Sequence, residues 1–472
     1  MTMGVEVLTD QEILASARKG GHRHIVRVVQ AVKEALRQGE TALLDGFLQE
    51  EHPADIALLI KRLEPSEATE LLLRLDPTKR AETFSQLSGR RQRLLSQELP
   101  RPVLVGLISD LKADRRADFF KHLPEKLRET LLPALAQAKR EDIRRLASYA
   151  EETAGALMTS EYAVLAPHLT ARQALERLRH EAPDKETIYR TYVVDEQRRL
   201  IGSLRLQTLI LAAPQATIAD LMERNPKRAH VNDDQEEVAR QIARYDLIAL
   251  PVVDDAGRLV GIVTHDDAVD VVHQEATEDM HKVGSLGRIT TSVREAGIGL
   301  LYRRRIVWLV VLIFGNLLSG AGIAFFEDTI AAYIGLVFFL PLLVGSGGNA
   351  GSQAATLMVR ALATGEVVLR DWSRMLGREL LVAGLLGLTM ALAVSGIGLL
   401  RGGPELALVV SATMVLIVLI GSLIGLSLPF LLNRLNVDPA TASAPLVTSL
   451  CDAVGVALYF GMATVLLGLP SV

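Results

Sequence analysis

The chain has 472 residues, a net charge of −4 at neutral pH and a pI near 6.2, so it lacks the basic excess typical of nucleic-acid-binding proteins. Its one cysteine, Cys451, excludes an internal disulfide. Residues 301–472 hold nine arginines, no lysine and eight acidic residues, and all ten histidines precede them. This uneven distribution predicts a charged, soluble part followed by an apolar part.

Residues 1–50 form an N-terminal extension. Their first 20 residues, MTMGVEVLTDQEILASARKG, lack the apolar segment of a signal peptide. We therefore expect the soluble part of the chain to stay in the cytosol.

Leucines recur every 12 residues through the next segment, which we delimit as residues 51–155. They are Leu63, Leu75, Leu87, Leu99, Leu111, Leu123 and Leu135. Prolines follow several of them closely, so each unit is interpreted as a short helix that ends at a proline-containing turn. Stacked units of this kind predict an all-α superhelix, which suits a sensor or scaffold and carries no catalytic signature.

Residues 156–265 contain two related units of strand and helix. In the second, a helix begins at Asp234, a strand covers 247–253, a turn follows, and a second strand covers 258–264. The first unit repeats this order with strands at 191–195 and 199–205. The pair resembles tandem CBS domains, α/β regulatory modules that often bind adenine nucleotides, which makes ATP a candidate ligand.

A strongly acidic helix is predicted to follow within residues 266–300, with Asp266 as its N-cap. Its six carboxylates are Asp266, Asp267, Asp270, Glu275, Glu278 and Asp279. The last three lie on one helix face. A solvated helix face is the alternative, but such a face normally interleaves basic residues, and Lys282 comes only at the end. The pattern therefore favours cation binding.

Residues 301–472 contain five uncharged runs. They cover 306–326, 329–359, 380–400, 406–433 and 439–472, the last interrupted only by Asp452. A helix needs about 20 apolar residues to cross a bilayer, so we predict a domain of five transmembrane helices, with its C-terminus outside the cell. Eight arginines then fall on cytosolic connections and Arg401 alone outside, as the positive-inside rule requires. Buried helices of a large soluble protein are the alternative.

Two features of these runs are unusual for simple membrane anchors. The second run contains the sequence GSGGNAGSQ at 345–353, which predicts irregular backbone that lines an ion path; close packing of helices through small residues is the alternative. The fifth run contains Asp452, with Thr448 one turn before it. A carboxylate inside a membrane marks an ion path, unless it forms a structural pair with an arginine.

The ligand types indicate a hard cation. Carboxylate, carbonyl and hydroxyl oxygens suit Mg²⁺, Ca²⁺ or Mn²⁺ rather than Zn²⁺ or Cu⁺. One carboxylate is little charge for a divalent ion, so we expect a homodimer whose twofold axis brings two copies of Asp452 together. An anion channel or a membrane-attached regulator remains an alternative, although an anion path would favour arginine or lysine over Asp452. No motif of an enzyme occurs, so we do not expect catalysis.

The order of these parts, together with EATED at 275–279, GSGGN at 345–349 and Asp452, resembles the MgtE family of Mg²⁺ channels from about residue 50 to the end. The resemblance implies a homodimeric, multi-pass inner-membrane protein that takes up Mg²⁺ and whose acidic helix is a plug closed by cytosolic Mg²⁺. Asp452, the backbone near Gly345 and Gly348, and Thr448 would form the pore site.

The resemblance also implies a set of regulatory Mg²⁺ ligands spread over the cytosolic parts. They are Glu82, Asp114, Asp118, Asp234, Glu236, Asp246, Asp267, Asp270, Glu275, Glu278 and Asp279, with Asp438 from the membrane side. His273, Ser352 and Ala444 depart from the family pattern. The selectivity among Mg²⁺, Mn²⁺, Co²⁺ and Ca²⁺ does not follow from the sequence.

Overall fold

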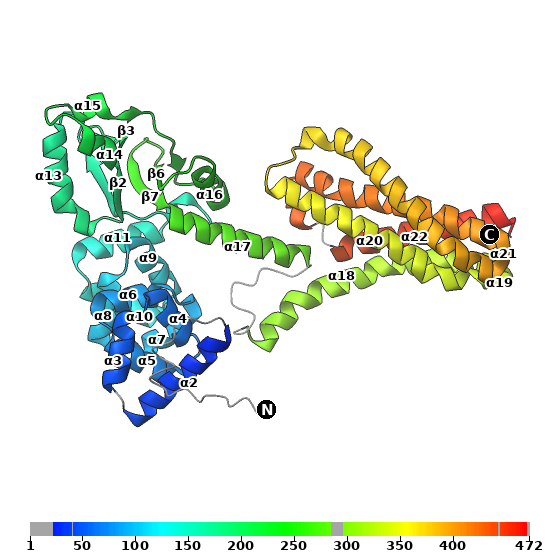
Figure 1. Ribbon diagram of the computed structural model, residues 1–472, viewed down its shortest axis with the longest axis horizontal. Helices are drawn as coiled ribbons and strands as arrows, with labels where there is room; N and C mark the ends of the chain where they lie inside the picture. Colours follow the sequence, from blue (N-terminus) through cyan, green and yellow to red (C-terminus); the bar gives the residue numbers. More distant parts are fainter. Residues whose placement is uncertain (1–21, 40, 285–295, 442–443, 470–472) are drawn as a thin grey trace, which may run out of the picture. The chain divides into compact units, whose positions relative to one another are not determined.

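The computed structural model describes residues 22–39, 41–284, 296–441 and 444–469. The chain divides into two compact units, Met1–His273 and Gln274–Val472. The first unit holds a helical domain and two small sheets, and the second holds the long apolar helices (Figure 1).

Short helices joined by tight turns make up the helical domain. In chain order they are α2 (His22–Gln38), α3 (Thr41–Glu50), α4 (Pro53–Ile60), α5 (Pro65–Arg74), α6 (Pro77–Ser85), α7 (Gly89–Glu98), α8 (Arg101–Asp110), α9 (Ala113–His122), α10 (Glu125–Leu131) and α11 (Gln137–Ala147). Side chains of α2 and α3, including Val32 and Leu44, share one hydrophobic core with the later helices. The helical core therefore includes part of the segment treated above as an extension.

The predicted period of 12 residues is confirmed. All seven leucines of the repeat are buried, and Leu75, Leu99, Leu111 and Leu123 each follow directly on the last residue of a helix. Burial of each leucine side chain contributes about 1.5–3 kcal/mol relative to exposure. Prolines occupy the first position of α4, α5 and α6, where the missing backbone N–H would lack a helical partner in any case.

The α/β part forms two sheets. Its elements are α12 (Ala154–Leu157), β1 (Tyr162–Leu165), α13 (Ala171–Glu181), β2 (Thr187–Val194), β3 (Leu200–Arg205), α14 (Leu206–Leu211), α15 (Ile218–Leu221), β4 (Glu223–Arg224), β5 (Ala229–His230), α16 (Gln235–Arg244), β6 (Ala249–Val253) and β7 (Leu259–Thr264). Strand order is β1-β2-β3-β4 in one sheet and β5-β6-β7 in the other. In both, a parallel pair precedes an antiparallel hairpin, which confirms the predicted duplication.

The two α/β units are joined by their matching turns. The backbone N–H of Leu200 donates to the carbonyl of Gly257 at 3.1 Å, and that of Leu259 donates to the carbonyl of Arg198 at 3.0 Å. Arg198 and Gly257 both have positive φ, 63° and 73°. The turn of each CBS unit thus accepts a hydrogen bond from the first residue of a strand in the other CBS unit.

Helix α17 (His265–Val283) follows β7 directly. Thr264, the last strand residue, donates from its hydroxyl to the Asp267 carboxylate at 2.8 Å. The predicted N-cap, Asp266, instead lies in the first helical turn. That detail of the sequence interpretation is wrong, because the helix begins one residue earlier than Asp266.

The second unit consists mainly of long apolar helices. They are α18 (Ile298–Phe325), α19 (Glu327–Ala332), α20 (Leu336–Ala363), α21 (Trp372–Arg434) and α22 (Ala444–Leu467). By length and hydropathy, three helical segments within the described residues can cross a membrane: Ile298–Phe325, Leu369–Arg434 and Ala444–Leu467. Arg303, Arg304 and Arg305 lie inside α18 rather than on a connection, because that helix begins at Ile298.

Helix α21 is 63 residues long, more than twice the roughly 20 residues that one crossing needs. It bends at Gly402 and Gly403, whose backbone angles are not helical. Gly403 has φ 75°, a left-handed conformation that glycine adopts without steric cost. The bend therefore separates two helical arms, each with the apolar character of a membrane span.

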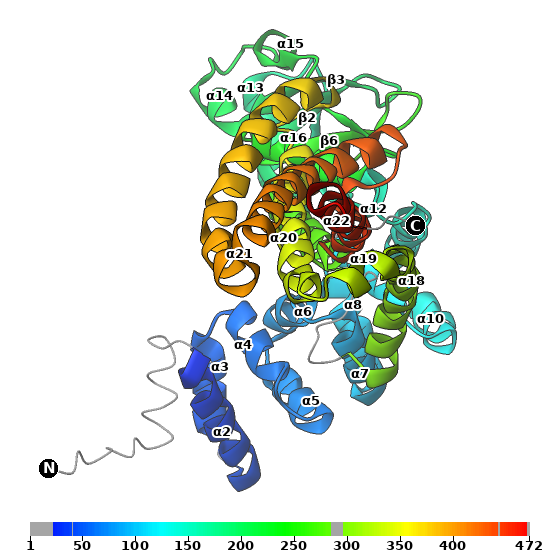
Figure 2. The ribbon, with the colours of Figure 1, turned by 90° about the vertical axis from the view of Figure 1, so that its right-hand side faces the viewer.

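The prediction of irregular backbone at 345–353 is wrong. Helix α20 continues through these residues without interruption, and it packs beside α21 and α22 (Figure 2). A Cβ on Gly351 would lie 2.7 Å from the carbonyl oxygen of Gly421, and a Cβ on Gly425 would overlap the carbonyl oxygen of Gly351. The glycines therefore allow close packing of helices, the alternative noted above.

Candidate metal sites

Asp452 lies on α22 and its side chain is partly exposed. Within the described residues, no hydrogen bond or ion pair engages its carboxylate. The alternative of a structural pair with an arginine therefore finds no support in this part of the chain. A carboxylate without a protein partner in an apolar helix has an unsatisfied charge, which a cation can neutralise.

Gly348 of α20 and Thr448 of α22 lie beside Asp452. A Cβ on Gly348 would be 3.5 Å from Asp452 Oδ1 and 2.9 Å from Thr448 Cγ2. The absence of a side chain at Gly348 thus leaves room beside the carboxylate. Gly345, one turn earlier on the same helix, has open space where a Cβ would lie. The structure thus brings three of the four predicted pore residues together.

Ser352 of α20 and Thr448 of α22 form a pair of hydroxyl groups beside this site. The hydroxyls of Ser352 and Thr448 lie 3.1 Å apart, and both can donate to the carbonyl oxygen of Ala444, at 3.3 Å and 2.9 Å. Two residues noted as departures from the family pattern, Ser352 and Ala444, therefore contact each other. The waters bound to a hydrated Mg²⁺ can donate hydrogen bonds to oxygens of this type.

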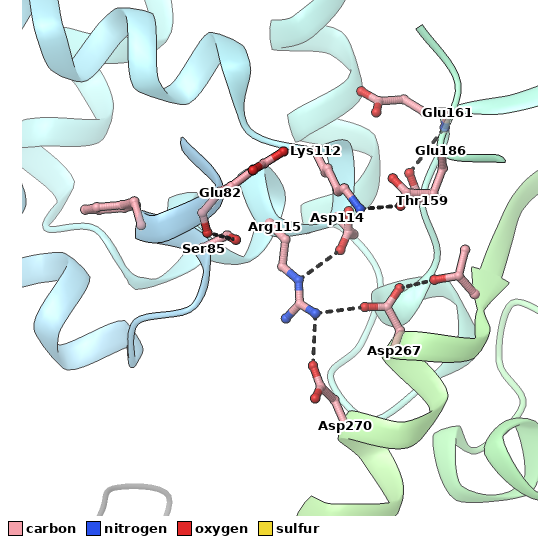
Figure 3. Close-up of polar contacts among 12 residues, drawn as sticks. Glu82, Ser85, Lys112, Asp114, Arg115, Thr159, Glu161, Glu186, Asp267 and Asp270 are labelled. Carbon is pink, nitrogen blue, oxygen red and sulfur yellow. Dashed lines mark hydrogen bonds and ion pairs between the residues drawn. The ribbon is translucent and has the colours of Figure 1, made fainter. Parts of the chain in front are cut away.

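In the first unit, three predicted regulatory carboxylates meet around Arg115 (Figure 3). The Arg115 Nη2 atom lies 3.0 Å from Asp267 Oδ1 and 2.9 Å from Asp270 Oδ2, and its Nε atom lies 3.4 Å from Asp114 Oδ2. We call Asp114, Asp267 and Asp270 the Arg115 cluster. Asp118, one turn from Asp114, lies 3.9 Å from Lys121 instead.

Burial changes the protonation of this cluster. It raises the pKa of Asp114, and together with the neighbouring charge of Asp114 it raises the pKa of Asp267 to about 7. Burial alone would lower the pKa of Arg115, but Asp267, Asp114 and Asp270 outweigh it and raise that pKa. The other oxygen of Asp114, Oδ1, is buried without a hydrogen-bond partner among the described residues. This oxygen is therefore free to accept a hydrogen bond or to contact a cation.

The predicted ligands of the second CBS unit already have structural roles. Asp234 is the N-cap of α16, and its carboxylate accepts hydrogen bonds from the backbone N–H of Glu236 at 2.8 Å and of Glu237 at 3.4 Å. The Glu236 carboxylate pairs with Arg240 at 2.6 Å. Asp246 follows the helix in a left-handed conformation, φ 54°. The structure does not bring these three carboxylates into the Arg115 cluster.

Glu82 lies on α6 and lines a surface cavity of about 410 Å³. Its neighbours there include Glu50, Glu51, His52 and Asp76. Figure 3 marks no ion pair between Glu82 and the Arg115 cluster. Among the residues that the structure describes, the lining of this cavity includes no other predicted regulatory ligand.

In the second unit, Lys282 lies in the last turn of α17, close to acidic side chains. Its Nζ atom lies 3.0 Å from Glu278 and 2.5 Å from Asp438. Burial opposes the charged form, but the hydrogen bonds that Lys282 donates to Asp438 and Glu278 raise the pKa of Lys282. We call Glu275, Glu278 and Asp279 the plug acids. Lys282 thus joins one plug acid to Asp438, and both carboxylates belong to the predicted set of regulatory ligands.

Within the described ranges, no three His, Cys, Asp or Glu side chains are already arranged to hold a metal ion. The sequence analysis missed Arg115, although it stands between Asp114 and Asp118 in KADRRAD. A basic residue inside an acidic motif was the available signal. Two of its three partners, Asp267 and Asp270, lie more than 150 positions away, so these contacts need the fold.

Known proteins match every part of this architecture. The family model of MgtE, a divalent cation transporter, matches residues 340–462, the MgtE intracellular N domain matches 51–152, and CBS domains match 154–214 and 218–274. The magnesium transporter MgtE of Thermus thermophilus is 42% identical over 454 residues, which cover 93% of this chain and 99% of the relative. The chain belongs to the MgtE family.

A second relative and a solved structure support this membership. The magnesium transporter MgtE of Bacillus subtilis is 32% identical over 430 residues, 91% of this chain and 95% of its own. The crystal structure of the cytosolic domain of the Mg²⁺ channel MgtE in complex with ATP is 39% identical, with a TM-score of 0.50, and covers 52% of this chain and 99% of its own. The resemblance inferred from the sequence is thereby confirmed, including the N domain and the CBS pair of MgtE.

Proposed function

We propose that this protein carries Mg²⁺ across the membrane through a pathway that includes Asp452. The observation that carries the proposal is the Asp452 carboxylate, which lies beside Gly348 and Thr448 and has no partner among the described residues. A hydrated Mg²⁺ keeps most of its waters, so the space beside Gly348 suits it better than a tight cage of protein ligands would. The MgtE relatives named as magnesium transporters support the choice of ion.

The membrane domain has five spans in this proposal. They are α18, α20, the two arms of α21 and α22, which places the C-terminus outside the cell and the N-terminal domains in the cytosol. Helix α20 is counted as a span although it carries GSGGNAGSQ, because its glycine face packs against α21 instead of facing lipid.

The conducting form is a homodimer in the lipid bilayer. One carboxylate gives a single negative charge, whereas a twofold axis beside α22 would supply two copies of Asp452 to one ion. Two carboxylates match the charge of one Mg²⁺.

Cytosolic Mg²⁺ closes the pathway by binding the regulatory carboxylates. The Arg115 cluster joins the N domain to the start of α17, and Lys282 joins the end of α17 to Asp438. Mg²⁺ favours the closed arrangement by the difference between its affinities for the closed and open forms. A change from 1:99 to 99:1 requires about 5.5 kcal/mol, which several ions acting together can supply.

The CBS pair is a second regulatory element and its candidate ligand is ATP. A cytosolic MgtE domain of similar sequence has been solved in complex with ATP. Direct binding of ATP to this chain, measured by calorimetry, tests that assignment independently of transport.

Ion flux into liposomes that contain the purified protein tests the transport function. We expect Mg²⁺ to enter when internal Mg²⁺ is low and flux to fall as internal Mg²⁺ rises. Asp452→Asn keeps the shape but removes the charge, so it should abolish flux. Asp328→Asn, which removes an acidic group of α19 in the same unit, is the matched control and should conduct normally.

Three results would contradict this account. Unchanged flux in Asp452→Asn would remove that residue from the pathway. Flux of Mn²⁺ or Co²⁺ without Mg²⁺ would reassign the ion, and flux of chloride would replace the cation pathway with an anion pathway.

A further inference from the structure

Arg115 places a permanent positive charge among carboxylates that Mg²⁺ would otherwise neutralise. The guanidinium contacts Asp267 and Asp270 through one nitrogen and Asp114 through another (Figure 3). Asp114 and Asp267 are 7% and 6% exposed. Charges that are this well buried are screened little by salt, so the arginine affects them strongly.

The other basic groups of this region have separate partners. Lys112 pairs with Glu186, and Arg116 pairs with Asp142 and Glu161. The cation that contacts all three members of the cluster is therefore Arg115. An arginine suits this position because its planar group donates to several carboxylates at once and stays protonated.

We propose that Arg115 is a built-in counterion that sets the Mg²⁺ concentration at which the cytosolic domains close. When all three carboxylates are ionised, Arg115 leaves the cluster a net negative charge that one divalent ion can neutralise. The contact between α9 and the start of α17 is then partly neutralised before Mg²⁺ binds. This proposal rests on the regulatory role of Mg²⁺ proposed above and adds the residue that tunes it.

Two opposite effects follow from removing the positive charge. Without Mg²⁺, Arg115→Gln leaves Asp114, Asp267 and Asp270 to repel one another, so the contact between α9 and α17 should loosen. With Mg²⁺, the same variant offers a more negative site, so Mg²⁺ should bind more tightly. A residue that only stabilises the fold would produce the first effect without the second.

Limited proteolysis of the full-length protein in detergent measures both effects, together with a calorimetric titration with Mg²⁺. Chymotrypsin is the suitable protease because the substitution leaves its sites unchanged. We expect Arg115→Gln to be cut faster than wild type in EDTA. We also expect the variant to reach half-maximal protection, and half-saturation in calorimetry, at an Mg²⁺ concentration at least about fivefold lower than that of wild type. A change in affinity of this size is typical of coupled sites.

Two variants serve as controls. Arg115→Lys keeps the charge and should have a midpoint within about twofold of wild type. Arg177→Gln removes an arginine of α13 that pairs with Glu181 on the helix surface, and it should behave as wild type. If Arg115→Gln does not fold, Arg115→Met takes its place, because it also removes the charge while keeping a long side chain, and the same lower Mg²⁺ midpoint is expected.

The outcomes separate the two proposals. An unchanged or higher Mg²⁺ midpoint in Arg115→Gln would overturn the counterion proposal while leaving Mg²⁺ regulation in place. The same result in Arg115→Met would overturn it as well. A wild-type protein that shows neither Mg²⁺-dependent protection nor heat of binding would instead refute the regulatory part of the proposed function.

Discussion

Replacement of Gly425 by alanine should destabilise the second unit, although the change adds only one methyl group. Gly425 is buried on α21, and a Cβ there would overlap the carbonyl oxygen of Gly351 on α20. That oxygen belongs to backbone, so it cannot move aside as the end of a flexible side chain could, and the two helices must separate. Overpacking of this kind costs about 1–3 kcal/mol, a large share of a typical unfolding free energy of about 5–15 kcal/mol.

Equilibrium unfolding in mixed micelles, followed by circular dichroism, measures this loss. Gly384→Ala is the matched control, because Gly384 lies on the same helix with open space around the added Cβ. Alanine has the higher helix propensity, by up to about 1 kcal/mol, so this control should be neutral or slightly stabilising. Equal stability of Gly425→Ala and wild type would refute the assignment of these glycines to close helix packing.

Three further predictions concern regulation and assembly. Replacing all three plug acids by alanine removes ligands from the closed form, so liposome flux should persist at internal Mg²⁺ levels that stop the wild type; flux that still stops would make α17 a plain connector. Asp234→Ala should lower the unfolding free energy by about 1 kcal/mol in chemical denaturation, because α16 loses its N-cap. Asp234→Asn should keep that stability, since asparagine also caps, while losing any Mg²⁺ affinity that depends on the charge; a loss equal to alanine's would contradict the capping role. Cysteines introduced into α20 and α22 should cross-link two copies of the chain, and conduction by a monomer would contradict the homodimer.

The helical repeat and the CBS pair could be predicted well from sequence because both are encoded locally. Each leucine of the 12-residue period is a neighbour of the helix end that it buries, as at Leu75 and Leu99. The turns of the two CBS units likewise carry the matching pairs Asp195–Arg199 and Asp254–Arg258, at 2.8 Å each. Patterns of this kind need no knowledge of the distant chain.

The glycine stretch of α20 and the role of Arg115 could not be derived in this way. A run of glycines permits both irregular backbone and close helix contact, and the choice depends on Gly421 and Gly425 of another helix. Arg115 acts through Asp267 and Asp270, which only the packing of α9 against the start of α17 brings near. Asp452 could be singled out because an isolated charge in an apolar run is visible without partners, and its role in an ion path stays a prediction.

The shared turns of the two CBS units also bear on how this chain is synthesised. Leu200 is hydrogen-bonded to Gly257, and Leu259 to Arg198. The first CBS unit therefore cannot form these hydrogen bonds of its β2–β3 hairpin until the second CBS unit has left the ribosome. Domains generally fold as whole units during synthesis, so the first CBS unit should remain open to proteases or chaperones while the second is translated. The CBS pair would then complete its folding shortly before the apolar helices that follow it in the chain are synthesised.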